Sequence, residues 1–141
     1  MGYMYLSSEE LRRECLEIIA GRADRDARLA EYLGNEILAS EATRYIAEFH
    51  PAPGPPLAPA FGRRSALVLS RISEVEAGSE RLSERSYSDI RDIIRAEARI
   101  QKGGGVLAPQ MEAWRSYLKR FKNTAELVAE IDQTLAQSKP R

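Results

Sequence analysis

Residues 111–135 read MEAWRSYLKRFKNTAELVAEIDQTL, with apolar side chains at alternating steps of three and four residues. These side chains are Met111, Trp114, Leu118, Phe121, Ala125, Val128, Ile131 and Leu135. Such spacing places them on one face of a long helix and predicts that this face packs against other helices. Because Asn123 and Glu126 can together cap a fresh helix, the sequence also allows a kink near Asn123.

Upstream of this stripe, residues 64–100 are also mostly helical in pattern. Ser86 with Asp89 can cap a helix whose buried side carries Ile90, Ile93, Ile94 and Ile100. The glycine run 103–105 should form a turn that ends this helix, and Pro109 suits the first turn of the next one. Residues 63–141 are therefore predicted to form a C-terminal helical bundle.

The N-terminal part, residues 1–50, is predicted to form a helical hairpin. Ser7 and Glu10 make a capping box at the start of its first helix. In the second helical region, residues 24–49, the apolar face changes sides near Gly34. We favour one continuous or slightly bent helix that contacts two neighbours, and a break at Gly34 is the alternative.

A proline-rich segment, residues 51–62, connects these two parts. Five of the seven prolines of the chain fall within the stretch HPAPGPPLAPAFG, residues 50–62. That density predicts an extended, polyproline-like strap, which acts as a plain connector. Its P-x-x-P spacing also fits an SH3-type ligand, although Arg63 and Arg64 lie too far along the chain for the usual basic anchor. The expected fold is all-α, with five to six helices and one shared core.

The composition is that of an ordinary globular chain. Its 141 residues carry 21 basic and 21 acidic side chains, so no net charge attracts it to nucleic acid or to anionic lipid. We expect a cytoplasmic protein, since no membrane span or secretory signal is visible and the single cysteine, Cys15, excludes an internal disulfide.

Residues that carry chemistry are scarce. Cys15 falls on an apolar helical face, and His50 precedes Pro51 at the end of a helix, where we expect it to face solvent. One histidine and one cysteine make no metal-ligand set or catalytic pair. An enzyme would have to rely on carboxylates alone, whose spacing indicates no site. We therefore expect no catalytic, cofactor-binding or metal-binding residues and no enzymatic activity.

Two groups of basic residues raise the alternative of DNA or RNA binding. Arg91, Arg95 and Arg99 recur every four residues on one helix and form a basic ridge, which a solvated face also explains. The second group interleaves Lys119, Arg120 and Lys122 with aromatic side chains, a mixture found in single-strand binders. This alternative gains support if both groups lie on one surface, and it loses support if acidic residues cover either group.

The favoured interpretation is a non-enzymatic protein–protein interaction module. The stripe at 111–135 and the two-faced helix at 24–49 suggest more apolar surface than one chain needs to bury. We therefore expect a homo-oligomer, most simply a dimer, that acts as an adaptor, chaperone, antiactivator or inhibitor by covering a partner protein's surface. The residues predicted for its interface are Met111, Trp114, Leu118, Phe121, Tyr45 and Phe49.

Overall fold

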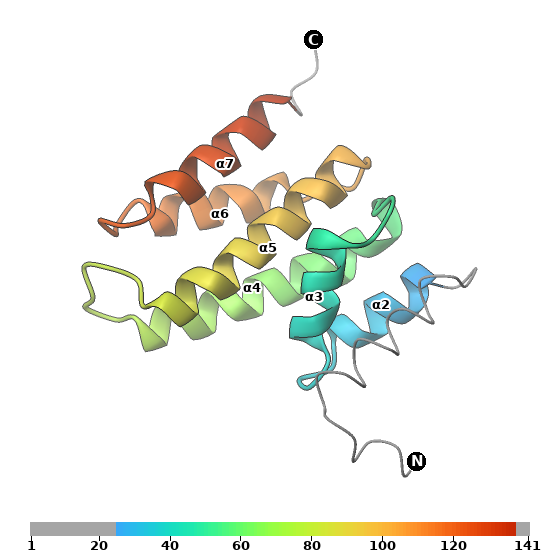
Figure 1. The fold of residues 1–141 in the computed structure, drawn as a ribbon, viewed down its shortest axis with the longest axis horizontal. Helices are drawn as coiled ribbons and strands as arrows, with labels where there is room; N and C mark the ends of the chain where they lie inside the picture. The colour runs from blue at the N-terminus through green and yellow to red at the C-terminus, as the bar shows by residue number, and fades with distance from the viewer. Residues whose placement is uncertain (1–24, 138–141) are drawn as a thin grey trace.

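A computed structural model describes residues 25–137 of the chain, and this part is all-helical, without a β-strand. In chain order the helices are α2 (Arg25–Leu33), α3 (Ala39–Glu48), α4 (Ala58–Val75), α5 (Glu84–Lys102), α6 (Ala108–Leu118) and α7 (Ala125–Gln137), with a short 3-10 helix, η2 (Pro55–Leu57), before α4. The prediction of an all-α bundle of five to six helices is confirmed (Figure 1).

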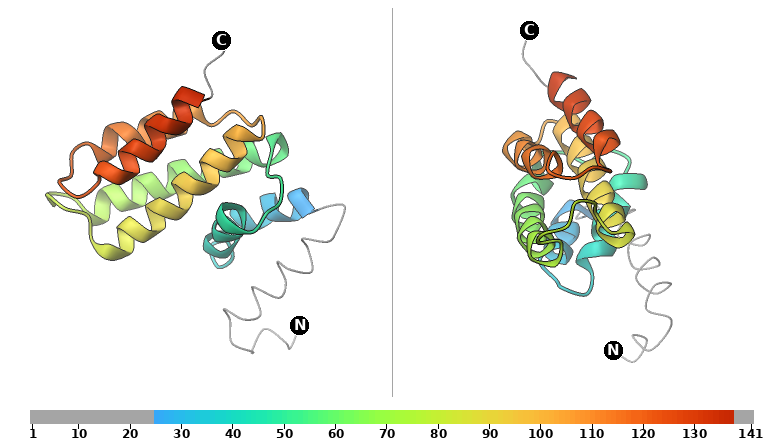
Figure 2. Two further views of the ribbon diagram at one scale, coloured as in Figure 1. Left: turned by 45° about the horizontal axis from the view of Figure 1, so that its top comes forward. Right: turned by 90° about the vertical axis from the view of Figure 1, so that its left-hand side faces the viewer.

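Helices α4 to α7 form an up-and-down bundle, in which α4 and α6 run in one direction and α5 and α7 in the other (Figures 1 and 2). Helices α2 and α3 cover one side of this bundle, where α3 packs along α5 and α2 packs against α4 and η2. Over residues 25–137, no helix is both long enough and apolar enough to cross a membrane.

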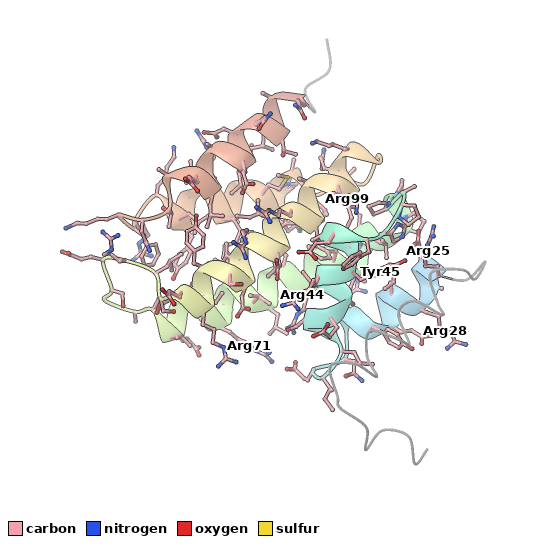
Figure 3. All side chains as sticks on the ribbon, viewed as in Figure 1. Arg25, Arg28, Arg44, Tyr45, Arg71 and Arg99 are labelled. Carbon is pink, nitrogen blue, oxygen red and sulfur yellow. The ribbon has the colours of Figure 1, made fainter. Side chains whose placement is uncertain are left out.

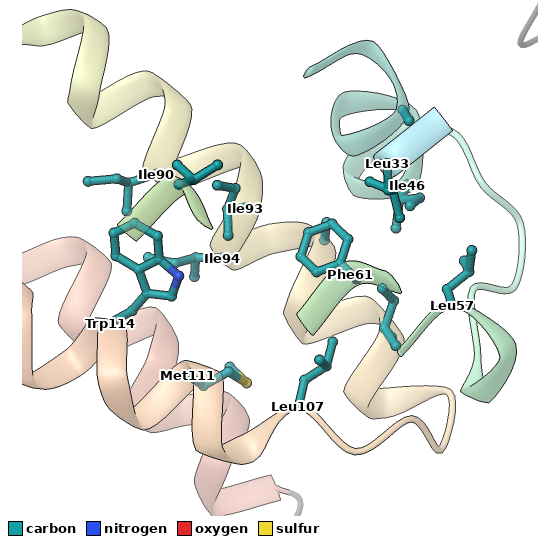
Figure 4. Close-up of a cluster of buried hydrophobic side chains, with 14 of the residues drawn as sticks. Leu33, Ile46, Leu57, Phe61, Ile90, Ile93, Ile94, Leu107, Met111 and Trp114 are labelled. Atoms are coloured by element: carbon teal, nitrogen blue, oxygen red, sulfur yellow. The ribbon is translucent and has the colours of Figure 1, made fainter. Parts of the chain in front are cut away.

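A single cluster of buried apolar side chains runs through all six α-helices. On one side of the core, Trp114 lies against Ile90, Ile93 and Ile94 of α5; on the other, Phe61 connects the bundle to α2 and α3 (Figure 4). The core includes the four isoleucines that the sequence placed on the buried side of the 86–100 helix: Ile90, Ile93, Ile94 and Ile100. The apolar periodicity therefore identified the inward face of α5 correctly.

The stripe at 111–135 is divided between two helices instead of one. Helix α6 ends at Leu118 and α7 begins at Ala125. Between them, the Thr124 hydroxyl donates to the Leu118 carbonyl oxygen at 2.6 Å. The Asn123 amide exchanges two hydrogen bonds with the Leu82 backbone, at 2.9 and 3.0 Å, which ties this turn to the α4–α5 loop. The chain therefore reverses where the sequence allowed only a kink.

The second helical region is also broken, so the favoured continuous helix is wrong and the alternative break at Gly34 is confirmed. Helix α2 ends at Leu33 and α3 begins at Ala39. The Asn35 side chain accepts hydrogen bonds from the backbone N–H groups of Ile37 and Leu38, at 2.8 and 3.1 Å, in an Asx-type turn. The predicted capping box at Ser7 and the apolar helical face predicted to carry Cys15 lie outside the described residues.

The proline-rich strap predicted for residues 51–62 is wrong in its second half. Pro55 and Pro56 begin η2, and α4 already starts at Ala58, with Pro59 in its first turn. Prolines are tolerated there because the N–H groups of a first helical turn have no intrahelical partner. A high density of prolines is therefore compatible with the first turn of a helix as well as with an extended connector.

The glycine run is a turn between helices, as predicted. Gly104 has φ of +101°, a left-handed conformation that favours glycine. A Cβ atom at Gly103 would collide with the backbone carbonyl of Pro53, so glycine lets the connector lie directly against the end of α5. The run thus serves the packing of the connector against the end of α5.

His50 is fully buried, which corrects the expectation that it faces solvent. Its Nδ1 accepts a hydrogen bond from the Ala52 N–H at 3.0 Å, so the ring proton sits on Nε2, which lies 2.6 Å from Asp26 Oδ1. Burial lowers the pKa of His50, and Asp26 opposes this effect only in part. The histidine is therefore neutral and joins α2 to the end of α3. Because both ring nitrogens are engaged, it has no lone pair left for a nucleophile.

We expect His50→Ala to lower the free energy of unfolding by about 2–3 kcal/mol, because it removes the imidazole donor from the Asp26 carboxylate and leaves the Ala52 N–H without its acceptor. Urea denaturation at pH 7.5 followed by far-UV circular dichroism measures this loss. The control is Phe49→Ala at the neighbouring, 55% exposed position, for which we expect a loss below about 1 kcal/mol. Equal losses in the two variants would contradict a structural role for the imidazole.

Candidate interaction surface

Most of the predicted interface residues are used in the chain's own core. Met111, Trp114 and Leu118 are at most 1% exposed, and Tyr45 is 6% exposed. These four are therefore unavailable to a second protein in this fold, which corrects their assignment. Helices α4, α5 and α7 cover the stripe, so the chain buries it without help. Phe121 is half-buried against the core, and Phe49 is the one of the six that is largely exposed.

The basic ridge on α5 is held by neighbouring helices. Arg99 donates to the Ile46 carbonyl oxygen at the end of α3, at 2.7 Å (Figure 3). Arg95 pairs with Glu130 of α7 at 3.7 Å. Arg91 is half-buried, and its Nε has no hydrogen-bond partner within residues 25–137. The ridge therefore contributes to the packing of α3 and α7 around α5, and only part of its charge remains for an anionic ligand.

The second basic group lies at the opposite end of the bundle from Arg99, in the turn between α6 and α7. Lys122 pairs with Glu80 of the α4–α5 loop at 3.0 Å, whereas Lys119 is exposed. The Arg120 guanidinium lies 5.8 Å from the centre of the Tyr117 ring, a cation–π distance. The two basic groups therefore do not form one continuous surface, and an acidic residue covers part of each.

An apolar hollow of about 570 Å³ opens between α4, α6 and the loop before α6. Its lining includes Pro55, Pro59, Gly62, Ala66, Val106 and Gln110. Val106 is 74% exposed, which is unusual for a large aliphatic side chain. The Gln110 Oε1 atom is buried and accepts no hydrogen bond from any described residue. The hollow thus combines uncovered apolar surface with one acceptor that lacks a donor.

A smaller, more polar hollow of about 200 Å³ lies between the other ends of the same two helices. Its lining includes Ser73, Glu76, Ser79, Tyr117, Arg120 and Phe121. The Tyr117 and Phe121 rings meet edge to face with their centres 5.1 Å apart, and they separate this hollow from the core. Arg120 supplies an exposed positive charge at its rim.

The two hollows lie along one face of the molecule because α4 and α6 run in the same direction. Gln110 and Tyr117 are two turns apart on α6, or about 10 Å at 1.5 Å per residue. Gly62 and Ser73 are three turns apart on α4, or about 16 Å. Between Gly62 and Ser73, α4 carries the exposed Ala66 of the apolar hollow and the half-buried Leu69, and between Gln110 and Tyr117, α6 carries the exposed Ala113. We call this surface the α4–α6 face.

The core contains one further group that the sequence analysis missed, the carboxyl of Glu97. Glu97 is completely buried; the Ser65 hydroxyl donates to its Oε1 at 3.0 Å, and the Trp114 indole N–H donates to Ser65 Oγ at 2.8 Å. Its Oε2 has no hydrogen-bond partner within residues 25–137. Burial raises the pKa of Glu97 to about 8, against the smaller lowering effect of the Ser65 hydrogen bond, so the acid is mostly neutral at pH 7.

The remaining chemistry of the described residues is limited. Residues 25–137 contain no group of three or more His, Cys, Asp or Glu side chains placed to hold a metal ion. Comparison of the chain with protein-family models, curated proteins and solved structures gave no match. The α4–α6 face is therefore the candidate functional surface of the described residues.

Proposed function

We propose that this chain is a non-enzymatic protein-binding module that receives an amphipathic helix of its partner on the α4–α6 face. The observation that carries the proposal is the pair of hollows between α4 and α6. Two parallel helices leave a shallow groove between them, and a third helix fills such a groove with its apolar face. By covering that helix, the chain would act as an adaptor, chaperone, antiactivator or inhibitor in the cytoplasm.

The lining of the two hollows specifies the chemistry of the partner. The apolar hollow accepts an aliphatic or aromatic side chain, and its lining also includes one charged residue, the exposed Arg63. At the other hollow, Arg120 favours a carboxylate. A separation of about 10–16 Å corresponds to side chains seven to eleven residues apart on a helix. We therefore expect a partner helix with an apolar anchor and an acidic residue at that spacing.

Nucleic-acid binding, through Arg91, Arg95, Arg99, Lys119, Arg120 and Lys122, is the less favoured function. Several of these side chains already contact groups of the chain itself, including Glu130, Glu80 and the Ile46 carbonyl oxygen. A phosphate backbone would have to compete with those contacts. Binding of a nucleic-acid strand would also require basic side chains in a continuous track. The two basic groups do not form one, because the group at 119–122 and Arg99 of the ridge lie at opposite ends of the bundle.

The proposal predicts that Ala66→Arg abolishes peptide binding without unfolding the protein. Ala66 is an exposed residue of the apolar hollow, so a long cationic side chain there would fill the hollow. The probe is a displayed library of helical peptides, from which binders are selected and measured by fluorescence anisotropy. We expect selected peptides to share an apolar and an acidic residue seven to eleven positions apart, and to lose at least about tenfold in affinity for the variant.

The matched control is Ala129→Arg, the same change at an exposed alanine of α7, which should bind like the wild type. Binders unaffected by Ala66→Arg would contradict the proposal. A fluorescent oligo(dT) that binds with steep salt dependence, when no peptide does, would instead support the nucleic-acid function. If light scattering shows a dimer at tens of micromolar that Ala66→Arg disrupts, the helix on this face belongs to a second copy of the chain.

A further inference from the structure

One carboxyl in the core connects three helices through two hydrogen bonds. Glu97 lies on α5, Ser65 on α4 and Trp114 on α6, and the indole donates to the hydroxyl that donates to the carboxyl. All three residues are at most 1% exposed. Since Glu97 Oε2 has no donor among the described residues, an ionised carboxyl would carry its charge in the core with a single hydrogen bond.

No charge on the surrounding helices compensates for ionisation. Among residues 25–137, the pKa of Glu97 is raised by burial and lowered only by Ser65, without a contribution from a charged side chain. Several charged residues on the neighbouring helices are paired with one another. These pairs are Arg115 with Asp132, Arg95 with Glu130, Arg44 with Asp92, and Arg71 with Glu36. The protonation of Glu97 is therefore set by the packing of the core around it.

We propose that Glu97, Ser65 and Trp114 form a proton-controlled latch, in which the neutral carboxyl holds α4, α5 and α6 together and loss of its proton loosens α6 from α4. Ionisation draws water or a counter-ion toward Glu97, which the close packing of Trp114 and Ser65 does not admit without movement. Because α4 and α6 also carry the two hollows, the latch would alter the α4–α6 face. That consequence rests on the proposed function, whereas the latch itself does not.

Trp114 is the only tryptophan of the chain, so its indole N–H gives a single resonance that reports on the latch. The experiment follows this resonance in ¹⁵N–¹H spectra, together with tryptophan emission, over a pH titration of the full chain. In the wild type we expect the indole shift to change and the emission to move to the red with a midpoint near pH 8, the pKa of Glu97. In Glu97→Gln, which stays neutral, both signals should remain constant.

The matched control is Glu76→Gln, because Glu76 is also buried, at 7% exposure, but accepts a backbone hydrogen bond from Ser83 at 2.6 Å. The indole resonance and the tryptophan emission of Glu76→Gln should change with pH as they do in the wild type. A second variant, Ser65→Ala, removes the hydrogen bond that lowers the pKa of Glu97 and should move the midpoint to higher pH. The latch is disproved if the wild-type indole does not respond up to about pH 9, or if Glu97→Gln shows the wild-type midpoint.

Discussion

Trp114→Ala is expected to lower the free energy of unfolding by about 4 kcal/mol, the largest loss of any single truncation considered. The indole is completely buried between α5 and α4, and its removal leaves a large apolar cavity in the centre of the bundle. It also removes the donor of the hydrogen bond to Ser65. Urea denaturation followed by far-UV circular dichroism at pH 6 measures the loss while Glu97 is neutral.

The control for this prediction is Trp114→Phe, which keeps most of the apolar volume but lacks the indole N–H. We expect a loss of about 1–2 kcal/mol, the cost of a missing hydrogen bond and a smaller cavity. If Trp114→Ala costs less than about 1.5 kcal/mol, Trp114 does not lie in the core. If its cost appears only at high protein concentration, the residue lies in an interface between chains, as the sequence had suggested.

That contrast shows what the periodicity of 111–135 can and cannot specify. The spacing of Trp114 and Leu118 predicts that these side chains pack against an apolar surface, and both are buried. It does not say whether the surface belongs to the same chain or to another. The answer depends on α4, α5 and α7, which lie together only in the folded bundle. Homo-oligomerisation was inferred from apolar surface that the chain itself covers.

The sequence predicted the helices more accurately than the positions at which they break. At Gly34 the sequence offered a break and a continuous helix, and the Asn35 side chain decides between them by holding two backbone N–H groups. Near Asn123 the side chain binds the backbone of Leu82, more than forty residues away in sequence, instead of capping the local helix. A contact of that kind has no local signal, whereas the turn at Gly34 does.

Glu97 did leave a signal that the sequence analysis did not use. It lies four residues after Ile93 and three before Ile100, so it shares their buried face. A carboxylic acid at a core position is rare and deserves a structural reason. The α4–α6 face left no such signal, because its residues come from two helices that are neighbours only in the fold. Hollows are a property of tertiary packing and seldom of sequence periodicity.

Glu97→Gln is expected to stabilise the protein at pH 7.5 by about 3 kcal/mol relative to the difference measured at pH 5. The folded-state pKa of about 8 lies above the ordinary value of 4.5, so between these values the folded state holds a proton that the unfolded state has lost. The contribution of Glu97 to stability is therefore complete below pH 4.5, and it falls by up to about 1.4 kcal/mol per pH unit as the pH rises toward 8.

Urea denaturation of both proteins at several pH values isolates this effect, because other titrating groups, such as His50, contribute equally to each and cancel in the difference. The stability difference should grow steadily with pH and level off above the folded-state pKa. Parallel stability curves for the wild type and Glu97→Gln would mean that Glu97 ionises at its ordinary pKa. In that case the core around Ser65 and Trp114 must be open to water. The packing of the bundle in solution would then be looser than in the structure.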